Sequence, residues 1–279
     1  MTFYQRYING ETKEVYDDIH KLGADAFLSD NIIDVEKVLT ETFERTAYNL
    51  DIIYKELVNI NYVFKTDFQY NFERPLIKPL KNTESLLQEL DKSVKQFGFV
   101  PLSLIMFYKI VGACNFAWDY DTNEDYIWNC ADPIQIISLD DLVSMYTDEY
   151  ALETFEEYYN EDGFIHLDLS ADYLHKDNIS GGAPYALQIT KNPSVDSQFL
   201  NEEHNTTFIN YLRICFENCG FSRITNPKYK NDYQAFFEKV KPQLKKYKNY
   251  IMTDFKNKTW ILSDFIKFVQ AKKRSLNKL

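Results

Sequence analysis

The most unusual absence in this sequence of 279 residues is that of positive charge between Lys109 and Lys176. The 66 residues between them contain no Lys or Arg, although an even spread of the chain's 31 basic residues would place about seven there. The same stretch contains 16 Asp and Glu, from Asp119 to Asp172. The sequence therefore predicts a surface of strong negative potential that attracts basic molecules.

Cysteine, histidine and glycine are also scarce. The four cysteines form no CxxC pair, and the four histidines fall in no zinc-ligand spacing, so neither a disulfide framework nor a structural metal site is indicated. The eight glycines form neither a phosphate-binding loop nor a nucleophile elbow. We expect no cofactor, no metal, no catalytic residues, and reduced, mostly buried thiols.

Long apolar runs are missing. No segment approaches the roughly 18 apolar residues of a membrane-spanning helix. Residues 1–14 are polar and charged, without the apolar centre of a signal peptide. We expect a cytoplasmic protein with no membrane association.

Two weaker patterns have a chemical interpretation. The pair His166-x-Asp168 and the pair His175-x-Asp177 flank an expected hairpin and could orient a ligand, but such histidines are more often structural. Residues 119–125 begin like a calcium loop, yet the required glycine and the final bidentate glutamate are absent. We therefore interpret that segment as a solvated acidic loop.

The C-terminal part has the opposite charge. Residues 226–279 hold 14 Lys and Arg and four acids, whereas residues 1–225 have a net charge of −21. Lysines alternate with aromatic residues around Tyr247 in a way compatible with nucleic-acid contact. The acidic body repels phosphate, so neutralisation of the acidic region by the tail is preferred, and no nucleic-acid partner is expected.

Hydrophobic periodicity predicts helices outside and strands in the middle of the chain. Expected helices lie at 34–61, 82–97, 101–110, 139–145, 205–219, 233–241 and 260–273. Expected strands lie at 113–118, 134–137, 164–169 and 185–189, and two prolines make residues 73–79 an extended linker or edge segment. This order favours an α+β fold over an alternating α/β fold, with a mixed, largely antiparallel central sheet flanked by helices and helical extensions at both ends.

Several short motifs resemble those of the SUKH superfamily, in its bacterial branch. They are Gly98-Phe-Val-Pro101 with Leu104, Phe107-Tyr108 and Val111-Gly112; Asp132-Pro133-Ile134; His175-Lys176; Ser180-Gly-Gly-Ala-Pro-Tyr185; Phe208-Ile-Asn-Tyr-Leu-Arg213; and Gly220-Phe221. The family's helix usually ends in Asn-Gly, where this chain has Val111-Gly112. The resemblance implies a non-enzymatic protein-binding fold: bacterial members are often immunity proteins that neutralise a toxin domain, and fungal members are regulators. It suggests a helical extension at 1–75, a SUKH-like core at 76–225 and a basic helical extension at 226–279.

We interpret the acidic stretch as the surface for a basic protein partner, a cognate toxin domain such as a nuclease, with aromatic residues as anchors. The expected contact residues are Trp118, Asp119, Tyr120, Asp121, Glu124, Asp125, Tyr126, Trp128, Asp148, Glu149, Glu153, Glu156, Glu157, Glu161 and Asp162. The competing interpretation is that the tryptophans belong to the core and that the acids only keep the protein soluble. Two other functions stay open: a scaffold or regulator of the same fold, and an enzyme that uses His166, His175 and Asp168.

Overall fold

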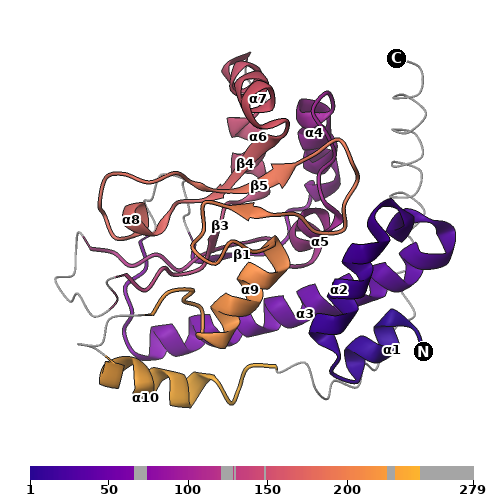
Figure 1. Ribbon diagram of the computed structural model, residues 1–279. Helices are drawn as coiled ribbons and strands as arrows, with labels where there is room; N and C mark the ends of the chain where they lie inside the picture. Colours follow the sequence, from indigo (N-terminus) through magenta and orange to yellow (C-terminus); the bar gives the residue numbers. More distant parts are fainter. Residues whose placement is uncertain (66–73, 121–127, 129, 148, 225–229, 246–279) are drawn as a thin grey trace. The chain divides into compact units, whose positions relative to one another are not determined.

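The computed structural model describes residues 1–65, 74–120, 128, 130–147, 149–224 and 230–245. The chain divides into two compact units, Met1–Glu41 with Lys246–Leu279, and Thr42–Lys245. The boundary between them falls within helix α3 (Ser29–Asn59). We describe each unit separately, and the elements are labelled in Figure 1.

The described part of the first unit is helical; the sequence suggested a helical extension at 1–75 but gave no helix bounds for its first 28 residues. It contains α1 (Phe3–Ile8), α2 (Thr12–Leu22), the 3-10 turn η1 (Gly23–Phe27) and the beginning of α3. Asp34 of α3 accepts hydrogen bonds from the backbone N–H groups of Phe3 and Tyr4, which lie at the start of α1. A carboxylate there satisfies N–H groups that have no partner within their own helix.

The second unit contains the remaining elements. They are β1 (Leu76–Ile77), α4 (Thr83–Val94), α5 (Leu102–Ile110), β2 (Ala113–Asn115), β3 (Gln135–Ile136), α6 (Leu139–Met145), α7 (Glu149–Asp162), β4 (Ile165–Ser170), α8 (Tyr173–Lys176), β5 (Tyr185–Ile189), β6 (Phe199–Leu200), α9 (Phe208–Glu217) and α10 (Lys230–Val240). The short elements α8 and β6 were not predicted. The helix expected at 260–273 lies outside the described residues.

The strands of this unit form two small sheets, β1-β2-β3 and β4-β5-β6, and the described pairs are all antiparallel. The N–H of Ile137 donates to the carbonyl of Leu169 at 2.8 Å, which connects the end of β3 to β4. The extended segment expected around the two prolines is the edge strand β1. The predicted α+β class, with antiparallel sheets flanked by helices, is therefore confirmed.

Helix α5 lies at the centre of this unit's core. All residues from Leu102 to Tyr108 are buried, as expected for a helix that is apolar on all sides. Phe107 packs edge-to-face on Phe43 of α3 and on Phe208 of α9, with ring centroids 6.0 and 5.5 Å apart. Helix α5 therefore packs on both α3 and α9, which lie far apart in the sequence.

Gly112 ends the turn after α5 with φ +98°. A Cβ at this position would lie 2.1 Å from the carbonyl oxygen of Ile77, so no other residue lets the chain pass so close to β1. This glycine was part of the motif that resembles the SUKH family.

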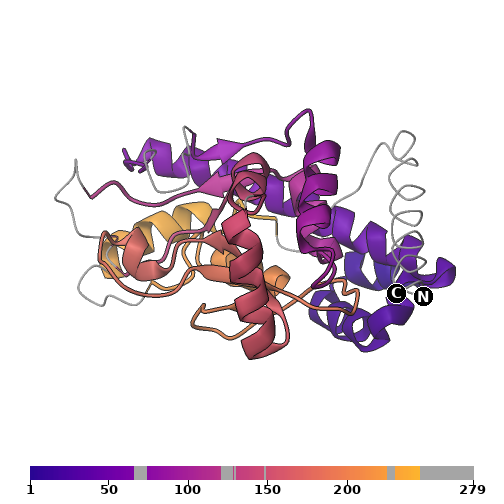
Figure 2. The ribbon, with the colours of Figure 1, turned by 90° about the horizontal axis from the view of Figure 1, so that it is seen from above.

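Helix α10 lies beside the C-terminal part of α3 (Figures 1 and 2). Lys239 forms an ion pair with Glu56 of α3 at 2.6 Å, and the Gln243 amide donates to the same carboxylate. Residues 230–245 therefore belong to the unit that holds most of the chain. The three-part division at residues 75 and 225 differs from these compact units.

Helix α3, with 31 residues, is the longest described element. Among the residues that the structure describes, no helix combines the length and the apolar character that crossing a membrane requires.

We predict that Glu56→Gln weakens the attachment of α10 by about 1 kcal/mol at neutral pH, because the ion pair is lost while one partner is half exposed. Hydrogen bonds from Lys239 and Gln243 hold the pKa of Glu56 below its usual value. A lowered folded-state pKa gives stability that is present above the unfolded pKa of about 4.3 and is lost as pH falls through the folded value. Urea unfolding from about pH 7 to about pH 3 should show the difference from wild type disappearing at low pH. A Glu89→Gln control should show no such trend, and a pH-independent difference for Glu56→Gln would contradict the prediction.

Candidate partner-binding surface

Helix α7, which carries six of the predicted contact residues, is attached to its unit by aromatic packing. Its buried stripe includes Ala151 and Phe155. The Phe155 ring stacks on Tyr146 with centroids 4.8 Å apart and meets Phe97 edge-to-face at 5.7 Å. Helices α7 and α10 lie at opposite ends of this unit (Figure 1). This attachment holds one side of α7 and leaves the remainder of its surface open.

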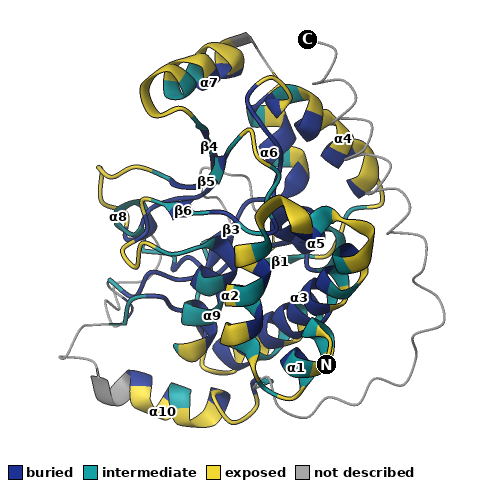
Figure 3. Ribbon diagram, turned by 45° about the vertical axis from the view of Figure 1, so that its right-hand side comes forward, coloured by how far each residue is buried: buried dark blue, intermediate teal, exposed yellow. Residues whose placement is uncertain are grey.

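The open side of α7 is acidic and partly apolar. It is coloured as exposed over much of its length in Figure 3, and its exposed carboxylates are those of Glu153, Glu156, Glu157, Glu161 and Asp162. Tyr150 and Leu152 on the same helix are 78% and 41% exposed. The helix contains no Lys or Arg, so neighbouring carboxylates receive no i,i+4 neutralisation within it. This combination of negative charge and exposed apolar side chains is typical of a surface that binds basic proteins.

The two histidine pairs are not brought together as a site. The His166 Nε2 lies 3.1 Å from Asp162, and its ring is stacked between Tyr158 and Phe164. The His175 Nδ1 contacts Asp172, which caps the same short helix. Each histidine thus pairs with a carboxylate three or four residues before it in the sequence. Among the residues with described positions, no group of three or more His, Cys, Asp and Glu could hold a metal ion.

Trp118 and Trp128 were expected as surface anchors, and the structure corrects this. They are only 4% and 3% exposed and both pack on Tyr62, with ring centroids 4.7 and 5.2 Å away. Trp128 also stacks on Phe221 at 4.7 Å and meets Phe236 of α10. Both indoles are core residues, as the competing interpretation had it. Trp118 is the last residue of the segment 113–118, which was expected to be an extended strand, and every residue of that segment is buried. The strand pattern was therefore a signal in the sequence that Trp118 is buried.

The other predicted contact residues have different outcomes. Asp119 and Tyr120 are half-buried, and the Tyr120 hydroxyl donates to Asp177 at 2.8 Å. Asp121, Glu124, Asp125, Tyr126 and Asp148 lie outside the described residues, and Glu149 begins α7 with its side chain not described. Exposed acids are therefore confined to α7 within the described part of the predicted surface.

A buried ion pair joins helix α8 to the segment that precedes β3. The Lys176 ammonium, fully buried, lies 2.7 Å from an oxygen of the Asp132 carboxylate, which is 2% exposed. The hydroxyls of Tyr185 and Ser222 donate to the other oxygen of that carboxylate, and the ammonium also lies 4.7 Å from the centre of the Tyr185 ring. The charges are thus neutralised by contacts from separate segments, as buried charges must be.

Sequence reasoning missed this pair, although Asp132 and Lys176 both occur in the motifs quoted above. An isolated Asp-Pro before a run of apolar residues was the available signal for a buried carboxylate. The arrangement is structural rather than catalytic, because both oxygens of Asp132 are occupied and the side chains involved are shielded from solvent.

The buried cysteines are poor nucleophiles. Burial raises the pKa of the Cys114 thiol to about 12 and that of Cys215 well above its usual value. A thiol that stays protonated at neutral pH neither attacks a substrate nor binds a metal readily.

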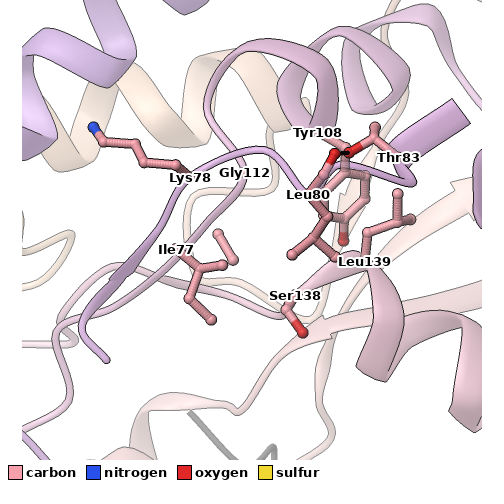
Figure 4. Close-up of a pocket in the computed structure, with 9 residues that line it drawn as sticks. Ile77, Lys78, Leu80, Thr83, Tyr108, Gly112, Ser138 and Leu139 are labelled. Atoms are coloured by element: carbon pink, nitrogen blue, oxygen red, sulfur yellow. Dashed lines mark hydrogen bonds between the residues drawn. The ribbon is translucent and has the colours of Figure 1, made fainter. Parts of the chain in front are cut away.

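Figure 4 shows a recess between the end of β1 and the start of α6. It offers a volume of about 10 Å³, roughly enough for one water molecule, against the roughly 300–1,000 Å³ of typical ligand pockets. The Tyr108 hydroxyl at this recess already donates to the carbonyl of Ile137, and Lys78 pairs with Asp51. The recess offers little space and few unsatisfied polar groups to a small molecule.

A scan against protein-family models matched no family, and searches among curated proteins and solved structures found no match. The likeness to the SUKH superfamily therefore rests on the sequence motifs alone.

We predict that Trp128→Ala lowers the free energy of unfolding by about 3–5 kcal/mol, because a buried indole leaves a cavity among four aromatic rings. Urea denaturation followed by circular dichroism measures this loss. Tyr150→Ala is the matched control, with an expected change within about 0.5 kcal/mol, since that ring is mostly in water. Equal losses for the two variants would contradict the assignment of Trp128 to the core.

We predict that Lys176→Met destabilises the protein by about 3–5 kcal/mol, since it leaves the Asp132 carboxylate buried without its cation. The double variant Lys176→Met with Asp132→Asn should recover part of the loss, because the neutral amide no longer requires a counter-charge. Urea unfolding of the double variant and of both single variants, Lys176→Met and Asp132→Asn, gives the three losses of unfolding free energy. A loss in the double variant that equals or exceeds the sum of the two single losses would contradict the pairing.

Proposed function

We propose that this protein is a non-enzymatic binding protein whose acidic surface captures a basic protein partner, as an immunity protein captures a toxin domain. The observation that carries the proposal is the open side of α7, where five exposed carboxylates occur on the same helix as exposed Tyr150 and Leu152, with no cation in the helix. The motifs similar to the SUKH superfamily support the same class of function. A cytoplasmic location fits this role.

The geometry of α7 suits electrostatic capture. Its carboxylates are exposed to solvent, and the helix is fixed at its buried stripe by Phe155, which stacks on Tyr146. A fixed array of like charges steers an oppositely charged partner and raises its association rate by orders of magnitude at low salt. Tyr150, instead of the buried tryptophans, is the aromatic side chain available for desolvated contact.

The same charge argues against nucleic acid as the partner. Phosphate groups approaching α7 meet carboxylates only, and the first 225 residues carry a net charge of −21. A basic toxin domain, for example a nuclease with a positively charged substrate groove, has the complementary charge.

We predict that reversing two charges of α7, in Glu156→Lys/Glu157→Lys, lowers the association rate constant for the partner at least about 10-fold at low salt. The partner is identified by co-expressing the full chain with the product of the neighbouring gene and confirming a stoichiometric complex. The matched control is Glu14→Lys/Asp17→Lys on α2, which has the same net charge and should bind nearly as wild type. Surface plasmon resonance at low and moderate salt measures both rates.

Each outcome has a clear meaning. An association rate that falls steeply with salt, and falls further only in the α7 variant, supports capture by this face. Equal decreases of the association rate constant in both double variants would show that the rate depends on the net charge of the protein and not on the location of the acids. A stable complex that is indifferent to salt and to the α7 reversal, or the lack of any basic partner, would refute the proposal and favour a regulator or scaffold that uses another surface.

A further inference from the structure

The last turn of α7 carries charges of the unfavourable sign. The end of a helix has a partial negative charge from its carbonyl groups, so cations stabilise it and carboxylates do not. Glu161 and Asp162 are the last two residues of α7, both are exposed, and the turn contains no basic residue. Violations of such local rules are expected mainly at functional sites. This end of α7 is therefore a place where a cation from another molecule would bind favourably.

Three stacked rings lie beside this turn. Tyr158 of α7 stacks on His166 of β4, with ring centroids 4.3 Å apart and 14° between the ring planes. Phe164 stacks on the same imidazole, with centroids 5.4 Å apart and 17° between the planes. Tyr158 and Phe164 are half-buried, so part of this aromatic surface is accessible from solvent. Nearly parallel rings offer a flat surface to a planar group.

The carboxylate of Asp162 belongs to the same cluster. Tyr158 and Asp162 are four residues apart and hence lie on one face of α7. One oxygen of Asp162 lies 3.1 Å from Nε2 of His166, and the Asp162 side chain is still 43% exposed. Within the part of the chain that the structure describes, no Lys or Arg pairs with this carboxylate or lies over the Tyr158 ring. A half-exposed ring and an exposed carboxylate thus occur together at the end of α7.

Other carboxylates contribute to a negative potential at the Tyr158 ring. Burial raises the pKa of the Tyr158 hydroxyl, and the charges of Asp168 and Glu157 act in the same direction. Both carboxylates therefore lie close enough to influence the ring. A cation at this position is attracted by the face of the ring and by the surrounding carboxylates together.

The same unit already holds one arginine with a ring and a carboxylate. The guanidinium carbon of Arg223 lies 4.0 Å from the centre of the Tyr173 ring, and its Nε lies 2.7 Å from an oxygen of Glu203. A planar guanidinium stacks on a ring and donates to a carboxylate in its own plane, whereas a compact, strongly hydrated ammonium does this less well. The two groups at the end of α7 therefore suit arginine better than lysine.

We propose that the C-terminal end of α7 binds an arginine side chain of the basic partner, which stacks on Tyr158 and pairs with Asp162. The assignment of this arginine to a protein partner rests on the proposed function. The preference for arginine goes beyond it, because charge alone attracts lysine to the acidic side of α7 equally well. The ring distinguishes the two cations, and the carboxylate attracts both.

The first measurement uses the free, full-length protein with argininamide and lysinamide, which carry the same charge, as probes. NMR titration should place argininamide at the backbone amides of residues 158–166. Its dissociation constant should be about 2- to 5-fold lower than that of lysinamide. Equal dissociation constants for the two probes, or shifts confined to other parts of the chain, would overturn the proposal.

Three substitutions separate the ring from the carboxylate. Tyr158→Leu removes the ring and should make the two probes bind equally, whereas Tyr158→Phe keeps the ring and should keep the preference. Asp162→Asn removes one charge and should weaken the binding of both probes by a similar factor of about 2 to 5. A Tyr158→Leu protein that still prefers argininamide would contradict stacking on this ring.

Matched controls lie elsewhere in the same unit. Glu217 is the exposed last residue of α9, and its neighbour four residues earlier is an arginine instead of a tyrosine. Tyr54 of α3 is a half-buried tyrosine in contact with another ring. Glu217→Gln and Tyr54→Leu should therefore bind both probes as wild type does. The same loss of affinity or preference in these controls would refute the assignment to α7.

Hydrogen exchange of the α5 core amides shows whether the Tyr158→Leu protein keeps its fold. If these amides exchange at the wild-type rate, the loss of preference belongs to the ring. If they exchange faster, the decision rests on the two probes with wild type and with Asp162→Asn. Equal affinity of Asp162→Asn and wild type for argininamide would then refute the site.

The second measurement uses the co-purified partner and separates this inference from the proposed function. Tyr158→Leu should raise the dissociation rate constant of the complex, and Glu217→Gln should leave it at the wild-type value. Equal rates for wild type and Tyr158→Leu would refute the arginine site in the complex and leave the proposed function intact. If wild type binds no basic partner, the proposed function is refuted, and with it the partner as the source of the arginine. The argininamide titration still decides whether the end of α7 binds a guanidinium group.

Discussion

The arrangement of the larger unit depends on the buried Asp132 carboxylate more than on any other single group. Lys176 from α8, Tyr185 from β5 and Ser222 after α9 all make contact with it. Apolar packing of equal strength would not specify which segments meet, because hydrophobic attraction has no direction. An ion pair with fixed donors is satisfied in one arrangement only, and any segment that moves leaves a buried charge without compensation.

The concentration of carboxylates in one part of this chain is unfavourable for the folded state. Carboxylates crowded without cations repel one another and destabilise the compact state. On α7 they lie in solvent, where water and salt screen the repulsion, whereas the buried carboxylates Asp132 and Asp177 each receive donors. The acids of α7 that remain exposed therefore contribute little to the stability of the fold.

Much of the fold could be predicted, because it follows from local periodicity. The apolar spacing of α4, α5 and α9, the glycines that end them and the antiparallel pair β4 and β5 are all visible in the sequence. The helical extension expected at 1–75 was given no bounds for α1 or α2, although Val15 and Ile19 of α2 lie at helical spacing and are both buried. The attachment of α1 depends on contacts such as that of Asp34 with Phe3, which no local pattern records.

The candidate surface was predicted less well, for the same reason. Charge counting located the acids of α7 correctly, since exposed charge needs no partner to be inferred. It could not show that Trp118 and Trp128 face inward, because an aromatic residue beside acids is compatible with either environment. It also could not reveal the pair of Asp132 and Lys176, which are 44 positions apart and meet only through the folded chain.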